Sequence, residues 1–271
     1  MRPWNKVVHE VSLRTPEDLS PLKEVPKHVE LRQMVDAINV FLAKVRESTE
    51  RERVFIADAA HELRTPLAAM RINVEALQSY ASIDSQQELL AGIIRSNSRA
   101  ARLVNQLLLM MHSEAHIDTV MGPVPLATLV QERMAVLAPL AAERRLELEF
   151  YSQDEVWITG ARERLMSLID NLIENAVKYS PEGGRVEVDI RTLEKSTQLR
   201  VSDSGPGISL DFRERVFDRF FRDPNQTQNG SGLGLAIVKA VAQQHNSTVC
   251  LSTSAEGGLM VIVTFPNQKL G

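Results

Sequence analysis

Two apolar seams dominate residues 50–113 of this 271-residue chain. Each repeats at alternating steps of four and three residues, an average of about 3.5 that is typical of helices packed in coiled coils or bundles. The seams comprise Ile56, Ala60, Leu63, Leu67, Met70, Val74 and Leu77, and then Leu90, Ile93, Asn97, Ala100, Val104, Leu107 and Met111, with a polar break at Asn97. Between them lies the turn-like segment ASIDSQQ. The spacing therefore predicts a long helical hairpin.

Each seam is narrow, so one hairpin buries little apolar surface by itself. A homodimer that builds a four-helix bundle from two hairpins is the most economical way to cover both seams. The alternative is a hairpin that packs against the C-terminal part of its own chain. We expect the homodimer.

The regions on either side of the hairpin differ in their patterns. Residues 1–48 hold two short amphipathic segments around the connector TPEDLSPLKEVP. From about residue 124, strand patterns alternate with helix patterns. The predicted strands include LELEFY, EVWIT, RVEVDIR, TQLRVSD, TVCLSTS and LMVIVTFP, and the predicted helices include RERLMSLIDNLIENAVKYS and LGLAIVKAVAQQH. This order predicts an α/β sandwich with one helical layer.

Bulk properties exclude several classes of protein. A net charge of −4 and a pI near 5.9 argue against direct nucleic-acid binding, which usually needs a basic face. The single cysteine, Cys250, cannot form a disulfide within one chain and fits a reducing compartment. No apolar run approaches the roughly 18 residues that span a bilayer, and the opening MRPWNKVVHE lacks the apolar core of a signal peptide. As given, the chain is expected to be soluble.

The segment HELRTPL places polar residues off the first seam. It begins like the zinc-protease signature, but Thr65 stands where the second histidine would be, and the other histidines show no ligand spacing. His61 and Thr65 are four residues apart and share an exposed helix face. An exposed imidazole can act as a nucleophile or proton carrier, and Glu62 can accept its proton or hold its tautomer. Pro66 removes the backbone donor to the Glu62 carbonyl, so we expect the helix to bend or loosen there.

A second set of polar residues lies on one face of a predicted helix. In NLIENAVKY these residues are Asn171, Asn175, Lys178 and Tyr179, opposite an apolar side. Asparagine is a mediocre helix former, so two in register suggest ligation. Amide oxygens suit a hard cation such as Mg²⁺, and the lysine suits phosphate.

Two glycine-rich segments complete the candidate site. In DSGPGI, Asp203 ends a strand and can accept from the exocyclic amine of adenine, while Gly205 and Gly207 permit a tight turn. In GSGLGLAIV, glycines 230, 232 and 234 precede or open a helix, whose N-terminus favours anions. Neither the common P-loop pattern nor a Rossmann fingerprint fits this second segment.

Five motifs in this order resemble those of orthodox sensor histidine kinases. FIADAAHELRTPLAAM is similar to their H box, and NLIENAVKY, DSGPGI, VFDRFFR and GSGLGLAIV are similar to the N, G1, F and G2 boxes of their ATPase domain. The resemblance implies a multidomain fold, α then α+β, in which a dimeric four-helix bundle precedes an α/β ATP-binding sandwich. More loosely, the N-terminal segments resemble a HAMP signal-relay module. The implied domains are residues 1–48, 49–115 and 122–271.

The resemblance also implies roles for individual residues. His61 would be phosphorylated from ATP and pass the phosphoryl group to an aspartate of a response regulator. Glu62 would be the general base, and Thr65 would place water in a phosphatase reaction. Residues 208–229 would form a lid over ATP. The residues that would bind nucleotide are Asn171, Asn175, Lys178, Tyr179, Asp203, Gly205, Gly207, Gly230, Gly232, Leu233 and Gly234. Asn175 would hold Mg²⁺, and Asn171 is a second candidate ligand. Arg219 and Arg222 are hypothetical phosphate contacts.

Other readings of the same residues remain open at this point. Gyrase-type, Hsp90-type and MutL-type ATPases share the nucleotide fold, but they use a glutamate where this chain has Asn171, and an amide cannot take the proton of water. The chain could also be a non-catalytic dimeric scaffold that binds a regulator, or a form in which phosphatase activity dominates. By resemblance, the natural protein would continue upstream into a transmembrane sensor of the bacterial inner membrane, with this part cytoplasmic.

Overall fold

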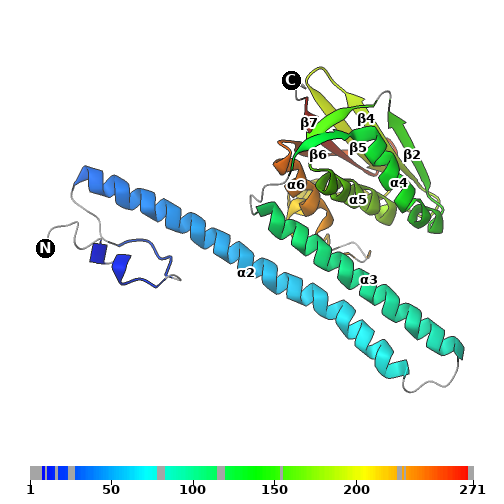
Figure 1. Ribbon diagram of the computed structural model, residues 1–271, viewed down its shortest axis with the longest axis horizontal. Coiled ribbons are helices and arrows are strands. Elements are labelled where there is room, and N and C mark those ends of the chain that lie inside the picture. The colour runs from blue at the N-terminus through cyan, green and yellow to red at the C-terminus, as the bar shows by residue number, and fades with distance from the viewer. Residues whose placement is uncertain are drawn as a thin grey trace. The chain divides into compact units, whose positions relative to one another are not determined.

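The computed structural model describes residues 8–9, 11–15, 18–23, 28–77, 83–114, 120–152, 155–224, 228 and 230–267 (Figure 1). Clustering of contacts divides the chain into two compact units, residues 1–64 and 65–271. Helix α2, Val29–Leu77, begins in the first unit and ends in the second. No helix in these ranges is both long enough and apolar enough to cross a membrane.

In the first unit, the connector packs against the start of α2. Leu22 and Val35 are buried together, with Ile38 and Leu42 beside them. The Asn39 side chain fixes this contact, since its Oδ1 accepts from the Leu22 amide at 2.6 Å and its Nδ2 donates to the Leu22 carbonyl at 3.4 Å. The second amphipathic segment of residues 1–48 thus forms the start of α2.

The second unit opens with the helical hairpin. Its second helix, α3, spans Ile83–Glu114 and meets the end of α2 closely, because a Cβ on Gly92 would lie 2.7 Å from Asn73 Nδ2. The sequence-based prediction of a turn at ASIDSQQ is wrong from Ile83 onward, since α3 already begins there. Gln86 and Gln87 have a high helix propensity, which favours their inclusion in the first turns of α3. Residues 78–82 lie outside the described part of the chain.

The rest of the second unit is a two-layer α/β fold. Its elements are β1 Gly122–Pro125, α4 Leu126–Glu143, β2 Glu147–Ser152, β3 Trp157–Gly160, α5 Arg162–Tyr179, β4 Arg185–Thr192, β5 Ser196–Asp203, the short 3₁₀ helices η1 Leu210–Phe212 and η2 Arg215–Phe217, α6 Gly234–Gln244, β6 Thr248–Thr253 and β7 Leu259–Pro266. Five strands form a sheet in the order β2-β4-β5-β7-β6, and β1 pairs with β3. All neighbours in the larger sheet are antiparallel except β2 and β4.

Helices α4, α5 and α6 cover one face of the sheet (Figure 1). The strands alternate accordingly, with every second side chain of β4 and β5 buried against the helices. The central helix α5 presents its apolar side to this core, including Leu165, Leu168 and Ile173, each at most 1% exposed. The predicted sandwich with one helical layer is confirmed, and it holds α5, the end of β5 and the start of α6 in fixed positions.

His245 joins the end of α6 to the start of α5. Its Nδ1 lies 2.7 Å from the Val241 carbonyl, and its Nε2 accepts from the Ala161 amide at 3.0 Å. The ring must be neutral to make both bonds. Burial lowers the pKa of His245, and the nearby charge of Arg164 lowers it further, whereas the bond to Val241 acts in the opposite direction.

We expect this histidine to make the domain acid-sensitive. Because its folded-state pKa lies below the ordinary 6.5, the unfolded chain binds more protons just below that pH, and the contribution to stability is lost as the pH falls through 6.5. The loss cannot exceed about 1.4 kcal/mol per pH unit, the limit for one proton. Thermal unfolding between about pH 7.5 and 5.5 measures it. A His245→Gln variant should show a shallower dependence, and equal slopes would contradict this role.

Candidate active site

Helix α5 brings the predicted asparagines to the edge of the core. Asn171 is 7% exposed, and its Nδ2 donates to the Ser167 carbonyl at 2.8 Å. Asn175 lies one turn further along and is half-buried. The helix ends with Lys178 and Tyr179, whose Nζ and hydroxyl are 2.8 Å apart. All four predicted residues lie along one side of α5, on which Asn171 is buried and the other three are partly exposed.

Arg144, just after α4, caps the end of α5. Its guanidinium donates to the carbonyls of Val177 and Lys178 and, at 2.9 Å, to that of Ser180. The last carbonyls of a helix have no partner within the helix, so these bonds stabilise the turn that carries Lys178 and Tyr179. Sequence reasoning missed Arg144, because an arginine in a polar linker between helix and strand carries no distinctive signal.

Asp203 ends β5 in a nearly closed environment. Its side chain is 7% exposed, and its Oδ1 accepts from the Gly205 amide at 2.9 Å and from the Leu259 amide at 3.0 Å. Burial raises the pKa of Asp203, and these two amides partly oppose that shift. Within the described residues, Oδ2 accepts no hydrogen bond. This oxygen is the one available to a ligand.

The turn between β6 and β7 holds Asp203 from the other side. Ser254 Oγ donates to the Asp203 carbonyl at 2.7 Å and accepts from the Gly258 amide at 2.9 Å. A Cβ on Gly258 would overlap the Asp203 carbonyl and lie 2.7 Å from its Oδ1. Sequence reasoning missed Ser254, Gly258 and Leu259, although the glycine pair before the last strand is a signal of close backbone approach.

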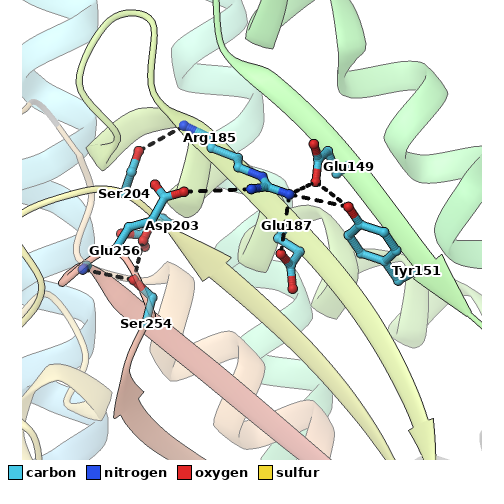
Figure 2. Close-up of polar contacts among 9 residues, drawn as sticks. Glu149, Tyr151, Arg185, Glu187, Asp203, Ser204, Ser254 and Glu256 are labelled. Carbon is cyan, nitrogen blue, oxygen red and sulfur yellow. Dashed lines mark hydrogen bonds and ion pairs between the residues drawn. The ribbon is translucent and has the colours of Figure 1, made fainter.

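Beside this turn, Arg185 of β4 lies at the centre of a surface cluster of charged residues (Figure 2). Its guanidinium contacts Glu149 and reaches Glu187 at 3.8 Å and Glu256 at 3.9 Å. The Tyr151 hydroxyl and Arg185 both donate to Glu149 and lower its pKa. Through Glu256, the cluster connects the sheet to the turn that lines Asp203.

Residues 230–234, here called the glycine turn, lie against α5. A Cβ on Gly230 would overlap Lys178 Nζ, and one on Gly234 would lie 2.8 Å from Asn175 Nδ2. Gly232 has a φ of +69° and would place a Cβ 2.6 Å from the Phe220 backbone, so only glycine fits there. Leu233 is fully buried and anchors the turn.

The first glycine segment closes the remaining side. A Cβ on Gly205 would lie 2.7 Å from the Tyr179 carbonyl and 2.9 Å from Asp203 Oδ1. Gly207 has a φ of +69°. The structure therefore brings three predicted groups together, namely the end of α5, the end of β5 and the glycine turn. Their contacts leave no room for side chains at several of these glycines, so the backbone of the glycine turn lies directly against α5.

The expected lid segment is partly described. Phe212 and Phe221 have ring centroids 5.7 Å apart, and Lys239 of α6 lies 5.4 Å from the Phe217 ring. Arg222 is exposed and donates to the Gln228 carbonyl at 2.9 Å, and Arg219 is half-buried. Residues 225–227 and 229 lie outside the described part. Arg222 thus contacts its own segment, and the role of both arginines as phosphate contacts stays a prediction.

The three residues of the first predicted site all lie on α2. His61 and Thr65 are exposed, as their places off the seam predict, and Glu62 is half-buried. Pro66 is buried within the helix, whose assigned bounds run on past it to Leu77, so the expected local bend does not end the helix.

Two family models match the chain. The one described as "Histidine kinase-, DNA gyrase B-, and HSP90-like ATPase" matches residues 160–269. The one described as "His Kinase A (phospho-acceptor) domain" matches residues 51–116. The second match contains His61, and the first contains Asp203 and the glycine turn.

Several sensor kinases are similar to the chain. It is 34% identical over 273 residues to Sensor protein kinase PmrB of Pseudomonas aeruginosa, which covers 99% of this chain and 57% of that protein. It is 34% identical over 252 residues to the histidine-protein kinase/phosphatase MprB of Mycobacterium ulcerans, with 89% of this chain and 48% of that protein covered. The chain thus spans about half the length of these curated relatives.

A solved structure extends the likeness to three dimensions. The structure of a mycobacterial sensor histidine kinase MprB matches with a TM-score of 0.50 at 30% identity, covering 54% of this chain and 97% of that one. Because almost all of that relative is matched, and because both characteristic domains are present in order, the chain belongs to the family of sensor histidine kinases.

Proposed function

We propose that this chain is the kinase portion of a two-component sensor, which transfers the γ-phosphoryl group of ATP to His61 and then to an aspartate of a response regulator. The observation that carries the proposal is the convergence of Asp203, the end of α5 and the glycine turn. A buried carboxylate together with a lysine and a glycine turn at the start of a helix suits a ligand with an amine at one end and phosphates at the other.

The donor set also fits Mg²⁺. The amide of Asn175 lies against the start of α6, beside the glycine turn where phosphates would bind. Mg²⁺ binds few protein groups and leaves its remaining positions to phosphate oxygens and water. When bound, it would offset charge on the phosphates during transfer. Asn175 is the residue we assign to it, whereas the Asn171 oxygen is directed toward Gln106.

The residues of this chain perform the transfer as follows. Asp203 Oδ2 accepts from the exocyclic amine of adenine, and Lys178 and the glycine turn hold the phosphates. A ring nitrogen of His61 forms a bond to the γ-phosphorus as the bond to the bridging oxygen breaks and ADP leaves. The other ring nitrogen loses its proton to Glu62. The regulator aspartate then attacks the phosphorus, and the P–N bond breaks.

Several features of the full protein are part of the same proposal. We infer a HAMP-like relay at residues 1–48, a dimerisation and phosphoacceptor hairpin at 49–115 and an ATP-binding domain at 122–271. Upstream we infer a transmembrane sensor in the bacterial inner membrane, with this portion in the cytoplasm. Thr65 supports a phosphatase activity on the phosphorylated regulator, and the relative MprB is named a kinase/phosphatase.

Labelling with γ-³²P ATP and magnesium tests the proposal. The expected product is a protein-bound label that acid releases and alkali does not, because phosphohistidine is a phosphoramidate. Transfer of that label to an added receiver domain would establish the second step. An acid-stable label would indicate a phosphoester instead. Unlabelled protein that still binds ATP would favour the scaffold or a phosphatase-dominated form.

The exposed seam of α2 supports the homodimer. Ile56, Leu67 and Val74 are 59%, 56% and 45% exposed in the single chain. Buried residues such as Phe55 and Pro66 lie on a neighbouring stripe. The stripe with Phe55 and Pro66 is already covered within the chain, whereas the seam with Ile56, Leu67 and Val74 is left exposed. The same seam of a second copy can cover it.

We expect Leu67→Glu to dissociate the dimer. Each copy loses the burial of an apolar side chain, worth roughly 1.5 kcal/mol, or about half the value for a fully buried leucine. Each copy also brings a charge into the interface. The dissociation constant of the dimer should therefore rise about 100-fold or more. Analytical ultracentrifugation measures this. Ala68→Glu adds the same charge on the His61 face of the helix and should leave the dimer intact. A dimer that survives Leu67→Glu would place the interface elsewhere.

A further inference from the structure

Gln106 connects helix α3 to two parts of the nucleotide site that are far apart in sequence. Its Nε2 donates to Asn171 Oδ1 at 3.3 Å, and its Oε1 accepts from Ser231 Oγ at 3.2 Å. Asn171 belongs to α5 and Ser231 to the glycine turn. One side-chain amide therefore bridges both from a third element, the second helix of the hairpin.

These hydrogen bonds occupy groups that a nucleotide would use. Both ends of the Asn171 amide are engaged, since its Nδ2 donates to the Ser167 carbonyl and its Oδ1 accepts from Gln106. Ser231 Oγ, while donating to Gln106, accepts from the Leu233 amide at 3.3 Å. That amide lies at the N-terminus of α6, where backbone donors favour an anion. Gln106 thus holds the glycine turn in an arrangement in which the Leu233 amide already donates to Ser231.

We propose that Gln106 is a positioning residue that couples attachment of α3 to nucleotide occupancy. This rests on the proposed function only in taking the glycine turn as the phosphate site. A phosphate that recruits the Leu233 amide must displace Ser231, and Gln106 opposes that displacement. Removing Gln106 releases Ser231, so nucleotide binds more tightly. By linkage, bound nucleotide weakens the contact of α3 with the glycine turn to the same degree.

Apolar packing also keeps α3 in place, apart from the Gln106 bridge. Helix α3 contacts α6, and its residues Leu103, Leu107 and Met110 are buried. None of these contacts uses the side chains of Asn171 or Ser231. Losing Gln106 alone should therefore leave the fold and the α3 contact largely intact and change mainly the freedom of the glycine turn.

Calorimetric titration of the whole 271-residue chain with Mg-ATP tests this inference. Gln106→Ala should bind ATP about three- to tenfold more tightly, the range expected for one neutral hydrogen bond. Asn105→Ala removes an exposed amide from the neighbouring position and should not change the affinity. In a Ser231→Ala background, Gln106→Ala should change it by less than about twofold, since the bridge is already broken.

The outcomes separate this inference from the proposed function. Unchanged or weaker binding by Gln106→Ala, with a wild-type unfolding temperature, would overturn the role of Gln106 while leaving the kinase proposal standing. If Gln106→Ala raised the ATP affinity equally with and without the Ser231 hydroxyl, the role of Gln106 would also be overturned, because the effect would not depend on the glycine turn. If no variant bound ATP, the proposed function would fail and this inference with it.

Discussion

A His61→Gln variant is expected to incorporate no phosphoryl label while still binding ATP. Glutamine has no nucleophilic ring nitrogen, and removal of an attacking group typically lowers the rate by more than about 1000-fold. His61 is exposed, so the substitution should not disturb the fold. The measurement is incorporation of label from γ-³²P ATP, with calorimetry on the same preparation to show that the nucleotide site is intact.

Two further variants identify the role of His61 more closely. His28→Gln removes another exposed histidine of the same unit and should leave labelling at the wild-type level. Glu62→Gln retains the nucleophile but removes the proposed base, so we expect labelling to fall by about 100- to 10,000-fold rather than vanish. Continued labelling of His61→Gln would move the phosphoacceptor to another residue. Undiminished ATP turnover without labelling would instead favour the clamp-type ATPases.

Regular patterns made most of the fold predictable. Alternation of apolar and polar residues identified β4 and β5 because each has one face against the helices. The helix α5 was predictable because its apolar side and its polar side are both local features of NLIENAVKY. The turn at ASIDSQQ was not, because helix propensity and tertiary packing decide where a polar segment joins a helix.

In the candidate site, too, local sequence patterns were predictable and contacts between distant elements were not. Lys178 and Gly230 could be assigned to one site because each belongs to a motif with its own spacing, and the structure places them in contact. The bridge through Gln106 could not be predicted, since one glutamine on a helix carries no local sign of its partners. Asn171 illustrates the difference: its spacing groups it with Asn175, but its oxygen is directed to another element.

Gly258 is the position at which we expect a single added methyl group to weaken nucleotide binding most. A Cβ there would overlap the Asp203 carbonyl and approach Oδ1 to 2.7 Å. The obstacle is backbone and a carboxylate held by two amides, so neither can move aside without losing those bonds. In Gly258→Ala, the end of β5 must shift. A charge-assisted hydrogen bond is worth about 1.5–3 kcal/mol, so ATP affinity should fall roughly 10- to 150-fold.

The neighbouring glycine provides the control for this experiment. Gly257 has a φ of +84° and open space where a Cβ would lie, and asparagine is the side chain that best tolerates such a backbone. Gly257→Asn should therefore keep wild-type ATP affinity in calorimetry, whereas Gly258→Ala should lose most of it. Since overpacking also costs about 1–3 kcal/mol of stability, the unfolding temperature of Gly258→Ala should fall as well, and binding must be measured well below it. If Gly258→Ala bound ATP normally, Asp203 would not be held in place for adenine by this turn. The ligand would then have to be recognised by the glycine turn and Lys178 alone, which would bind phosphates without distinguishing one nucleotide base from another.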